Sequence, residues 1–176
     1  MQPSSNASSK TVSGEPKLVL RELRRSDRAQ LEAVLISTQV FYADEIAVAL
    51  ELIDKGEDDT PDTYRFVVAE LDGRVVGYSC YGHTPCTDTV FDMYWAAVDK
   101  TLQNQGLGKK IFLETERRIR ALGGRMIVLE TASKEEYQAT RAFYLRNGYH
   151  EAARVKDFYK LGDDKVIYVR VLRPES

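Results

Sequence analysis

Several features that mark other classes of protein are scarce in this sequence. It contains two cysteines, Cys80 and Cys86, which are too few and wrongly spaced for a disulfide scaffold or a zinc site. No stretch approaches the roughly 20 apolar residues of a membrane-spanning helix. Basic residues are not in excess, because 25 lysines and arginines stand against 27 aspartates and glutamates. We therefore expect no membrane partner and no nucleic-acid partner bound through surplus positive charge.

What the sequence does contain indicates one globular domain. Its 176 residues are close to the usual length of a single domain, and 43% of them are hydrophobic. Residues 1–16 are rich in serine and lack the apolar run of roughly 7 to 15 residues that a secretory signal needs. We expect them to form a disordered tail, residues 17–176 to form the domain, and the protein to be cytoplasmic.

The hydrophobic pattern predicts a mixed α/β fold, with about seven strands in one sheet flanked by about four helices. Strands and helices alternate only in the second half of the chain. The sheet should therefore be mostly antiparallel and become parallel around residues 98–109. The expected strands are residues 17–24, 64–71, 75–81, 89–99, 126–131, 149–156 and 166–172, and the expected helices are residues 29–40, 44–55, 107–121 and 135–147.

The most informative segment is the polar loop at residues 98–109, between a predicted buried strand and a predicted helix. Gly106 and Gly108 open the helix, so the backbone can approach a ligand closely. The unpaired N–H groups of the first helical turn and the helix dipole both favour a negatively charged ligand. The loop is therefore a candidate anion-binding site, although a pair of glycines also fits an ordinary strand-to-helix turn.

Two common phosphate-binding motifs do not fit this loop. A Walker A motif would need a glycine in place of Gln103 and a serine or threonine in place of Lys110. A dinucleotide-binding motif would need a third glycine, and Ile111 occupies that position. The pattern that remains is Gln103-x-x-Gly106-x-Gly108.

This pattern resembles the pyrophosphate loop of the GNAT superfamily of N-acetyltransferases, which reads Gln/Arg-x-x-Gly-x-Gly/Ala after a strand and before a helix. The family's next helix carries Asn-x-x-Ala-x-x-x-Tyr-x-x-x-Gly-Phe. At the same spacing this chain has Tyr137, Thr140, Tyr144, Gly148 and Tyr149. Two positions depart from the family: Asn104 stands where glycine is common, and Tyr137 replaces the asparagine. The resemblance covers about residues 18–172.

The resemblance implies a bacterial-type N-acetyltransferase that uses acetyl-CoA and no metal. The acetyl group would move to a primary amine by direct attack through a tetrahedral intermediate. The amine acceptor would be a small molecule or a protein, and the chain could form a homodimer. The residues implied in cofactor binding are Ala96, Ala97, Val98, Gln103, Asn104, Gln105, Gly106, Leu107, Gly108, Lys109 and Tyr137.

Three residues are candidates for the chemistry. By resemblance, Tyr144 would protonate the leaving thiolate, and the backbone N–H of Ala96 would polarise the thioester carbonyl. An aromatic anchor between helix and sheet is the other interpretation of Tyr144. Asp92 precedes Ala96 by four residues, so strand alternation places it on the same face, where it is a candidate base. A solvated or substrate-binding carboxylate fits Asp92 equally well, and Glu45, Glu130 or a water chain are alternative bases.

Acidic residues gather in segment 44–62, which carries eight aspartates and glutamates against one lysine. Such a segment would attract a cationic amine, or it would simply be a solubilising surface. A function of a different class remains open as well. A non-catalytic acyl-CoA-binding sensor or regulatory module would need the glycine loop but not Tyr144.

Overall fold

The computed structural model describes residues 16–56 and 64–172 of the chain. Nearly all of the expected tail at residues 1–16 lies outside these ranges, as do four acidic residues of segment 44–62, namely Glu57, Asp58, Asp59 and Asp62. In the part of the chain that is described, no helix is both long and apolar enough to cross a membrane.

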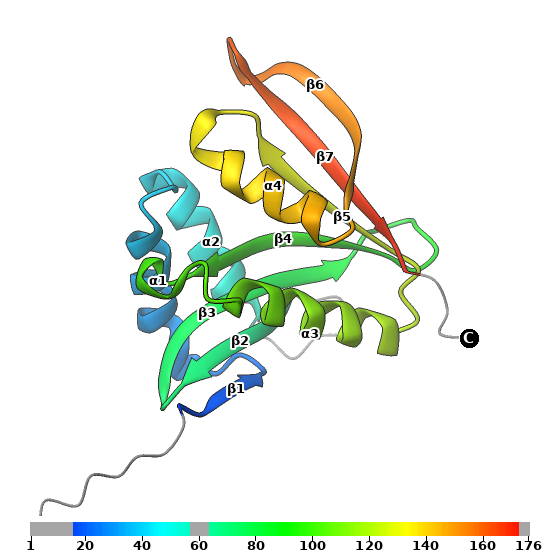
Figure 1. Ribbon diagram of the computed structural model, residues 1–176. Coiled ribbons are helices and arrows are strands. Elements are labelled where there is room, and N and C mark those ends of the chain that lie inside the picture. The colour runs from blue at the N-terminus through cyan, green and yellow to red at the C-terminus, as the bar shows by residue number, and fades with distance from the viewer. Residues whose placement is uncertain (1–15, 57–63, 173–176) are drawn as a thin grey trace, which may run out of the picture.

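One seven-stranded sheet organises the fold, with the strand order β1-β2-β3-β4-β5-β7-β6 (Figure 1). The strands are β1 Leu18–Arg21, β2 Arg65–Leu71, β3 Arg74–His83, β4 Val90–Val98, β5 Met126–Ala132, β6 His150–Lys160 and β7 Asp163–Val171. β4 and β5 run parallel, and each of the other neighbouring pairs is antiparallel. The predicted mixed and mostly antiparallel sheet is confirmed.

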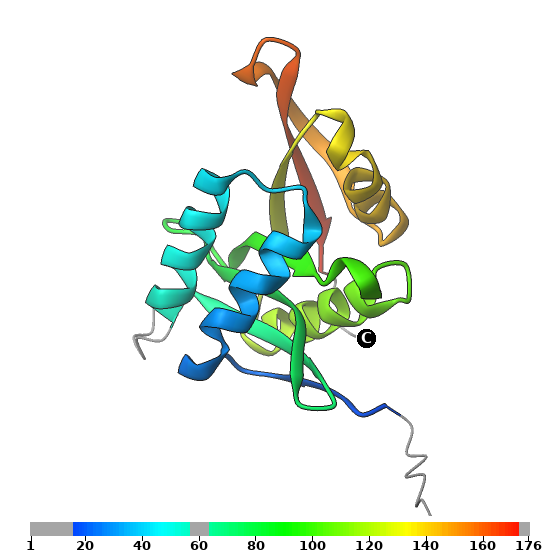
Figure 2. The same ribbon diagram turned by 90° about the vertical axis from the view of Figure 1, so that its left-hand side faces the viewer.

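Within the described residues, four α-helices cover the two faces of the sheet (Figure 2). They are α1 Arg28–Thr38, α2 Ala43–Gly56, α3 Leu107–Ala121 and α4 Gln138–Arg146. One apolar core lies between the sheet and α1 and α2, around Leu31, Leu35 and Ile53. The other lies under α3 and α4, around Ile111 and Phe112. The helix expected at residues 107–121 begins and ends where predicted, since glycines flank it on both sides.

The last hairpin is tighter than the sequence pattern predicts. Lys160 pairs with Asp163, so the connection between β6 and β7 consists of Leu161 and Gly162 alone. Gly162 has a φ of 80°, a left-handed conformation that glycine adopts without a steric penalty. Every residue of β6 is exposed, and two bulges interrupt its pairing with β7.

A bulge in β4 shapes the centre of the sheet. Cys80 on β3 pairs with Trp95 on β4, and the next residue, Tyr81, pairs with Met93. Tyr94 is therefore an extra residue without a partner on β3. A bulge of this kind bends a strand and interrupts the alternation of its side chains between the two faces.

The bulge separates two side chains that regular alternation would place together. Before it, Phe91 and Met93 belong to the core under α3 and α4; after it, Ala96 and Val98 pack against that same core. Asp92 lies between Phe91 and Met93 and points to the opposite face, which α1 and α2 cover. The expectation that Asp92 shares a face with Ala96 is therefore wrong.

Beyond the bulge, β4 and β5 diverge (Figure 1). The two strands pair only from Val90 to Met93 and from Met126 to Leu129. The rest of β5 pairs with β7, and the rest of β4 pairs with β3. Within the described residues, the β5-facing edge of β4 therefore has no strand partner from Tyr94 to Val98. We call this region the β4–β5 split.

Candidate active site

The loop after β4 is held in place by side chains that bond to its own backbone. Asp99 accepts hydrogen bonds from the N–H of Thr101 at 2.9 Å and from its hydroxyl at 2.7 Å. These bonds lower the pKa of Asp99 below its ordinary value, with help from Arg74. The Gln103 amide donates to the carbonyl oxygen of Val98 at 3.1 Å. The loop therefore starts from a fixed position at the end of β4.

Backbone N–H groups without an acceptor in the helix lie where this loop enters α3. Asn104 and Gly106 adopt left-handed conformations, with φ of 61° and 80°. The first backbone hydrogen bond of α3 runs from the N–H of Lys110 to the carbonyl oxygen of Gly106, at 3.1 Å. The N–H groups of Leu107 and Gly108 precede it, so they have no acceptor within the helix. A Cβ added to Gly106 would meet nothing within 4 Å, so a ligand could approach the backbone there.

An unpartnered hydroxyl lies beside the split. Thr131 is 6% exposed, and its Oγ1 is buried without a hydrogen-bond partner among the described residues. It follows Leu129, the last β5 residue that pairs with β4, and shares its face of the sheet. A buried hydroxyl without a partner is costly, so this group is free to bond to a ligand. Sequence analysis missed Thr131, because a threonine within a strand carries no distinguishing pattern.

Tyr144 projects from α4 into an aromatic cluster on the α3/α4 side of the sheet. Its ring centroid lies 5.5 Å from that of Tyr168, 5.9 Å from Phe112 and 6.1 Å from Tyr149. Burial among these rings raises the pKa of Tyr144 above its ordinary value of 10. Its hydroxyl has no hydrogen-bond partner in residues 16–56 and 64–172. The side chain is therefore both a packing anchor and a protonated, available donor.

Asp92 is half-buried on the opposite face of β4. Burial raises the pKa of its carboxyl, while a hydrogen bond of 2.8 Å from the Thr84 hydroxyl lowers it in part. The charge of Glu130 raises this pKa further, and that of Lys165 lowers it. A carboxylate whose pKa is raised by its surroundings is better matched to accepting a proton from an amine.

Tyr137 ends a short 3-10 helix that leads into α4 and is 9% exposed. Its hydroxyl donates to Oε1 of Glu45 at 3.4 Å. Burial, followed by the nearby charge of Glu45, raises the pKa of Tyr137. This contact joins the start of α2 to the start of α4. The role of Tyr137 in cofactor binding, implied by the family motif, stays a prediction.

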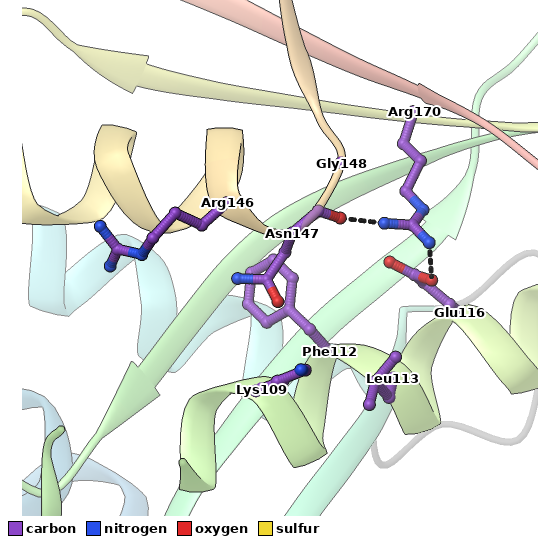
Figure 3. A pocket seen from close by; sticks show the side chains of 8 residues that line it. All are labelled: Lys109, Phe112, Leu113, Glu116, Arg146, Asn147, Gly148 and Arg170. Atoms are coloured by element: carbon purple, nitrogen blue, oxygen red, sulfur yellow. Dashed lines mark hydrogen bonds and ion pairs between the residues drawn. The ribbon is translucent and has the colours of Figure 1, made fainter. Parts of the chain in front are cut away.

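A hollow of about 280 Å³ lies between α3 and the C-terminal end of α4 (Figure 3). Inside it, Arg170 forms an ion pair of 3.2 Å with Glu116 and donates to the carbonyl of Asn147. Lys109 and Arg146 also line the hollow, and neither has a carboxylate within 4 Å in the described part of the chain. The hollow therefore carries two uncompensated positive charges near the glycine loop.

Chemical groups that would hold a metal are not brought together here. Across residues 16–56 and 64–172, no group of three histidine, cysteine, aspartate or glutamate side chains is placed to bind a metal ion.

Together, these features define a class of protein that binds an extended ligand carrying phosphates. A loop with free N–H groups follows a strand whose edge is open, with an unpartnered hydroxyl and a basic hollow nearby. The arrangement suits an extended ligand that carries phosphates at one end.

The comparisons identify the family within that class. The family profile described as an acetyltransferase (GNAT) domain matches residues 62–151. A structure assigned to the GNAT acetyltransferase family, from Desulfovibrio desulfuricans, is 37% identical, with 88% of this chain and 99% of that chain covered and a TM-score of 0.83. The chain therefore belongs to the GNAT acetyltransferase family, whose members use acetyl-CoA.

More distant structures share the fold. The ribosomal-protein-S18-alanine N-acetyltransferase from Escherichia coli is 17% identical, with a TM-score of 0.70 over 91% of this chain and 97% of that one. An aminoglycoside 6'-N-acetyltransferase complexed with coenzyme A is also 17% identical, with a TM-score of 0.70 over 90% and 99% of the two chains. No curated protein sequence matches the chain significantly.

Proposed function

We propose that this chain is an acetyl-CoA-dependent N-acetyltransferase that acetylates a primary amine. The observation that carries the proposal is the meeting of two features at one end of the β4–β5 split. The unpaired edge of β4 leads directly into the glycine loop, which ends at the N–H groups of Leu107 and Gly108 that lack an acceptor in α3. Family membership supports acetyl transfer, and the similarity to N-acetyltransferases with two different acceptors supports nitrogen as the atom acetylated.

The residues present fit acetyl-CoA. The N–H groups of residues 104–109 would bind its pyrophosphate, since the N–H of Gln103 already donates to the carbonyl of Lys100. The open edge of Ala96, Ala97 and Val98 would pair with its extended arm like an added strand. The Thr131 hydroxyl would supply a further hydrogen bond beside that edge. Lys109 and Arg146 would attract the remaining phosphate to the hollow between α3 and α4. When bound, acetyl-CoA supplies a thioester whose carbonyl carbon a neutral amine can attack.

The chain's own groups divide the chemistry between the two faces of the sheet. The N–H of Ala96 would donate to the oxygen on which negative charge develops. The Tyr144 hydroxyl, on the α3/α4 side, would give its proton to the departing sulfur. Asp92, on the α1/α2 side, would accept a proton from the amine. The acceptor therefore approaches the split from the α1/α2 side, which we call the acceptor side.

Ligand-dependent unfolding tests the proposal. A ligand at about 100 times its dissociation constant stabilises a protein by about 2.7 kcal/mol, which should raise the melting temperature by about 5 to 10 °C for this chain length. We expect that shift with acetyl-CoA and CoA, a smaller one with dephospho-CoA, and none with ATP. Release of free thiol from acetyl-CoA in the presence of amines would then establish turnover. No shift with acetyl-CoA would overturn the proposal, whereas a shift without turnover of any amine would favour the sensor.

The pH dependence of kcat/KM tests the role of Asp92. Because its pKa is raised by burial and partly lowered by the Thr84 hydroxyl, activity should fall as the pH drops through that pKa. The fall in activity at low pH is the acidic limb of the pH profile. Thr84→Val removes the donor and raises the pKa of Asp92 further, so it should move the acidic limb to higher pH. Thr84→Ser keeps the donor and should leave the limb in place.

A second variant completes the test of the base. Asp92→Asn should lower kcat/KM by about 100-fold or more and abolish the acidic limb. If Asp92→Asn retains both the rate and the limb, another group accepts the proton.

A further inference from the structure

Two tyrosines surround the ammonium group of Lys134 near the acceptor side. Lys134 Nζ lies 4.1 Å from the ring centroid of Tyr42 and 4.8 Å from that of Tyr137, both within range of a cation–π interaction. Glu45 is tied to both tyrosines. It accepts a hydrogen bond from the Tyr137 hydroxyl at 3.4 Å and another from the Tyr42 backbone N–H at 2.7 Å. We call Tyr42, Tyr137 and Glu45 the cation cage.

The lysine side chain can leave this cage without disturbing the backbone around it. The N–H of Lys134 donates to the buried carboxylate of Asp163 at 3.1 Å, and its carbonyl accepts from Arg141 at 2.9 Å. Its ammonium, in contrast, has no carboxylate within 4 Å among the described residues. The ammonium of this flexible side chain is held only by its two ring contacts, so another ammonium can displace it.

The cage is open to solvent on one side and closed on the other. Tyr42 is 54% exposed, whereas Tyr137 is 9% exposed and forms the inner wall. Tyr137 directly precedes α4, the helix that carries Tyr144, so the inner wall of the cage belongs to the same segment as the candidate acid. Figure 1 shows the start of α2 beside the start of α4, where these residues meet.

We propose that the cation cage binds a second ammonium group of the acceptor, an aliphatic diamine or polyamine, and that the Lys134 ammonium is the group it displaces. This inference rests on the proposed function. The end of a lysine side chain is an alkylammonium, so the group seated in the cage is chemically the same as one end of an aliphatic diamine. The other end would carry the amine that is acetylated. Glu45 supplies the negative charge that a cationic group needs and a neutral one does not.

Matched amines and matched variants test the cage. For the wild-type protein, kcat/KM should be at least about 10-fold higher for the best member of a series of unbranched diamines than for the monoamine of equal chain length. Tyr42→Leu should lower kcat/KM for the diamine by about 5- to 10-fold, and Tyr42→Phe, which keeps the ring, should not. Lys134→Ala removes the competing ammonium and should raise kcat/KM for the diamine by about 3- to 10-fold, while Lys134→Arg should not. The monoamine should respond to none of these changes.

Two results would overturn the proposal. One is an equal loss with diamine and monoamine in Tyr42→Leu or Lys134→Ala, because the tyrosine and lysine would then only support the fold at this point. The other is acetylation of peptides with an N-terminal lysine in preference to every free diamine, because the acceptor would then be a protein.

A binding measurement separates this proposal from the proposed function. Calorimetric titration of the CoA-saturated protein with the same diamine needs no turnover, and Lys134→Ala should bind the diamine about 3- to 10-fold more tightly than the wild type. If no amine is acetylated but this tightening is seen, the cage stands and the catalytic proposal fails. If amines are acetylated, but Lys134→Ala does not bind the diamine more tightly and diamines are not preferred, the cage proposal fails and the proposed function stands.

Discussion

Replacing Tyr144 with phenylalanine is expected to lower kcat by about 100-fold or more and to leave the dissociation constant of acetyl-CoA nearly unchanged. Phenylalanine keeps the ring that packs against Phe112 and Tyr168, so the aromatic cluster remains filled. It removes only the hydroxyl, which has no other partner in the described part of the chain. Steady-state rates of thiol release, combined with thermal unfolding in acetyl-CoA, measure the two quantities separately.

Tyr168→Phe provides the matched control for this variant. Tyr168 belongs to the same cluster, with its ring centroid 5.5 Å from that of Tyr144, but is not placed as a proton donor. Its loss of a hydroxyl should leave kcat within about 2-fold of the wild type. If Tyr144→Phe turns over as fast as this control, the leaving thiolate takes its proton from elsewhere and Tyr144 is a packing residue.

The second large effect is expected from Gly106→Ala, which should weaken acetyl-CoA binding by at least about 10-fold. Gly106 has a φ of 80°, a conformation that costs an alanine about 1 to 2 kcal/mol. Its new Cβ would also stand in the open space above the loop, where we place the pyrophosphate. The N–H groups would turn away or the ligand would be held off, and the melting temperature should no longer rise at moderate acetyl-CoA concentrations.

Gly123→Ala separates the loss of binding from the loss of stability. Gly123 has a φ of 78° and equally open surroundings, but it lies beyond the far end of α3. Both variants should unfold at lower temperature than the wild type in buffer, and only Gly106→Ala should lose the response to acetyl-CoA. An equal response in the two variants would show that the loop does not bind the ligand as proposed.

The sequence predicts most of this fold because hydrophobic periodicity and glycine positions act locally. The helix at residues 107–121 ends at glycines, and the strands expected at residues 64–71 and 75–81 lie within β2 and β3 or at their ends. The glycine loop lies at the end of β4 for the same reason. Local patterns therefore predict where the glycine loop lies in the fold.

What the sequence could not show depends on contacts between distant segments. The bulge at Tyr94 inserts one residue into a run of apolar and aromatic side chains, and nothing in that run marks it. Regular strand alternation therefore predicts the wrong face of β4 for Asp92. The unpartnered hydroxyl of Thr131 and the position of the Lys134 ammonium between two tyrosine rings likewise depend on residues that are distant in the sequence.

The exposure of every residue of β6 has a consequence for how this protein can diverge. A strand without a fully buried side chain can change its sequence with little loss of core stability, provided that its backbone still pairs with β7. Yet Tyr159 on this strand is within electrostatic reach of Glu45 and Glu130, whose charges help to raise its pKa. Under the proposed function, mutation of β6 would alter the surroundings of the acceptor at little cost to the core, which would make this strand a ready source of new substrate preferences.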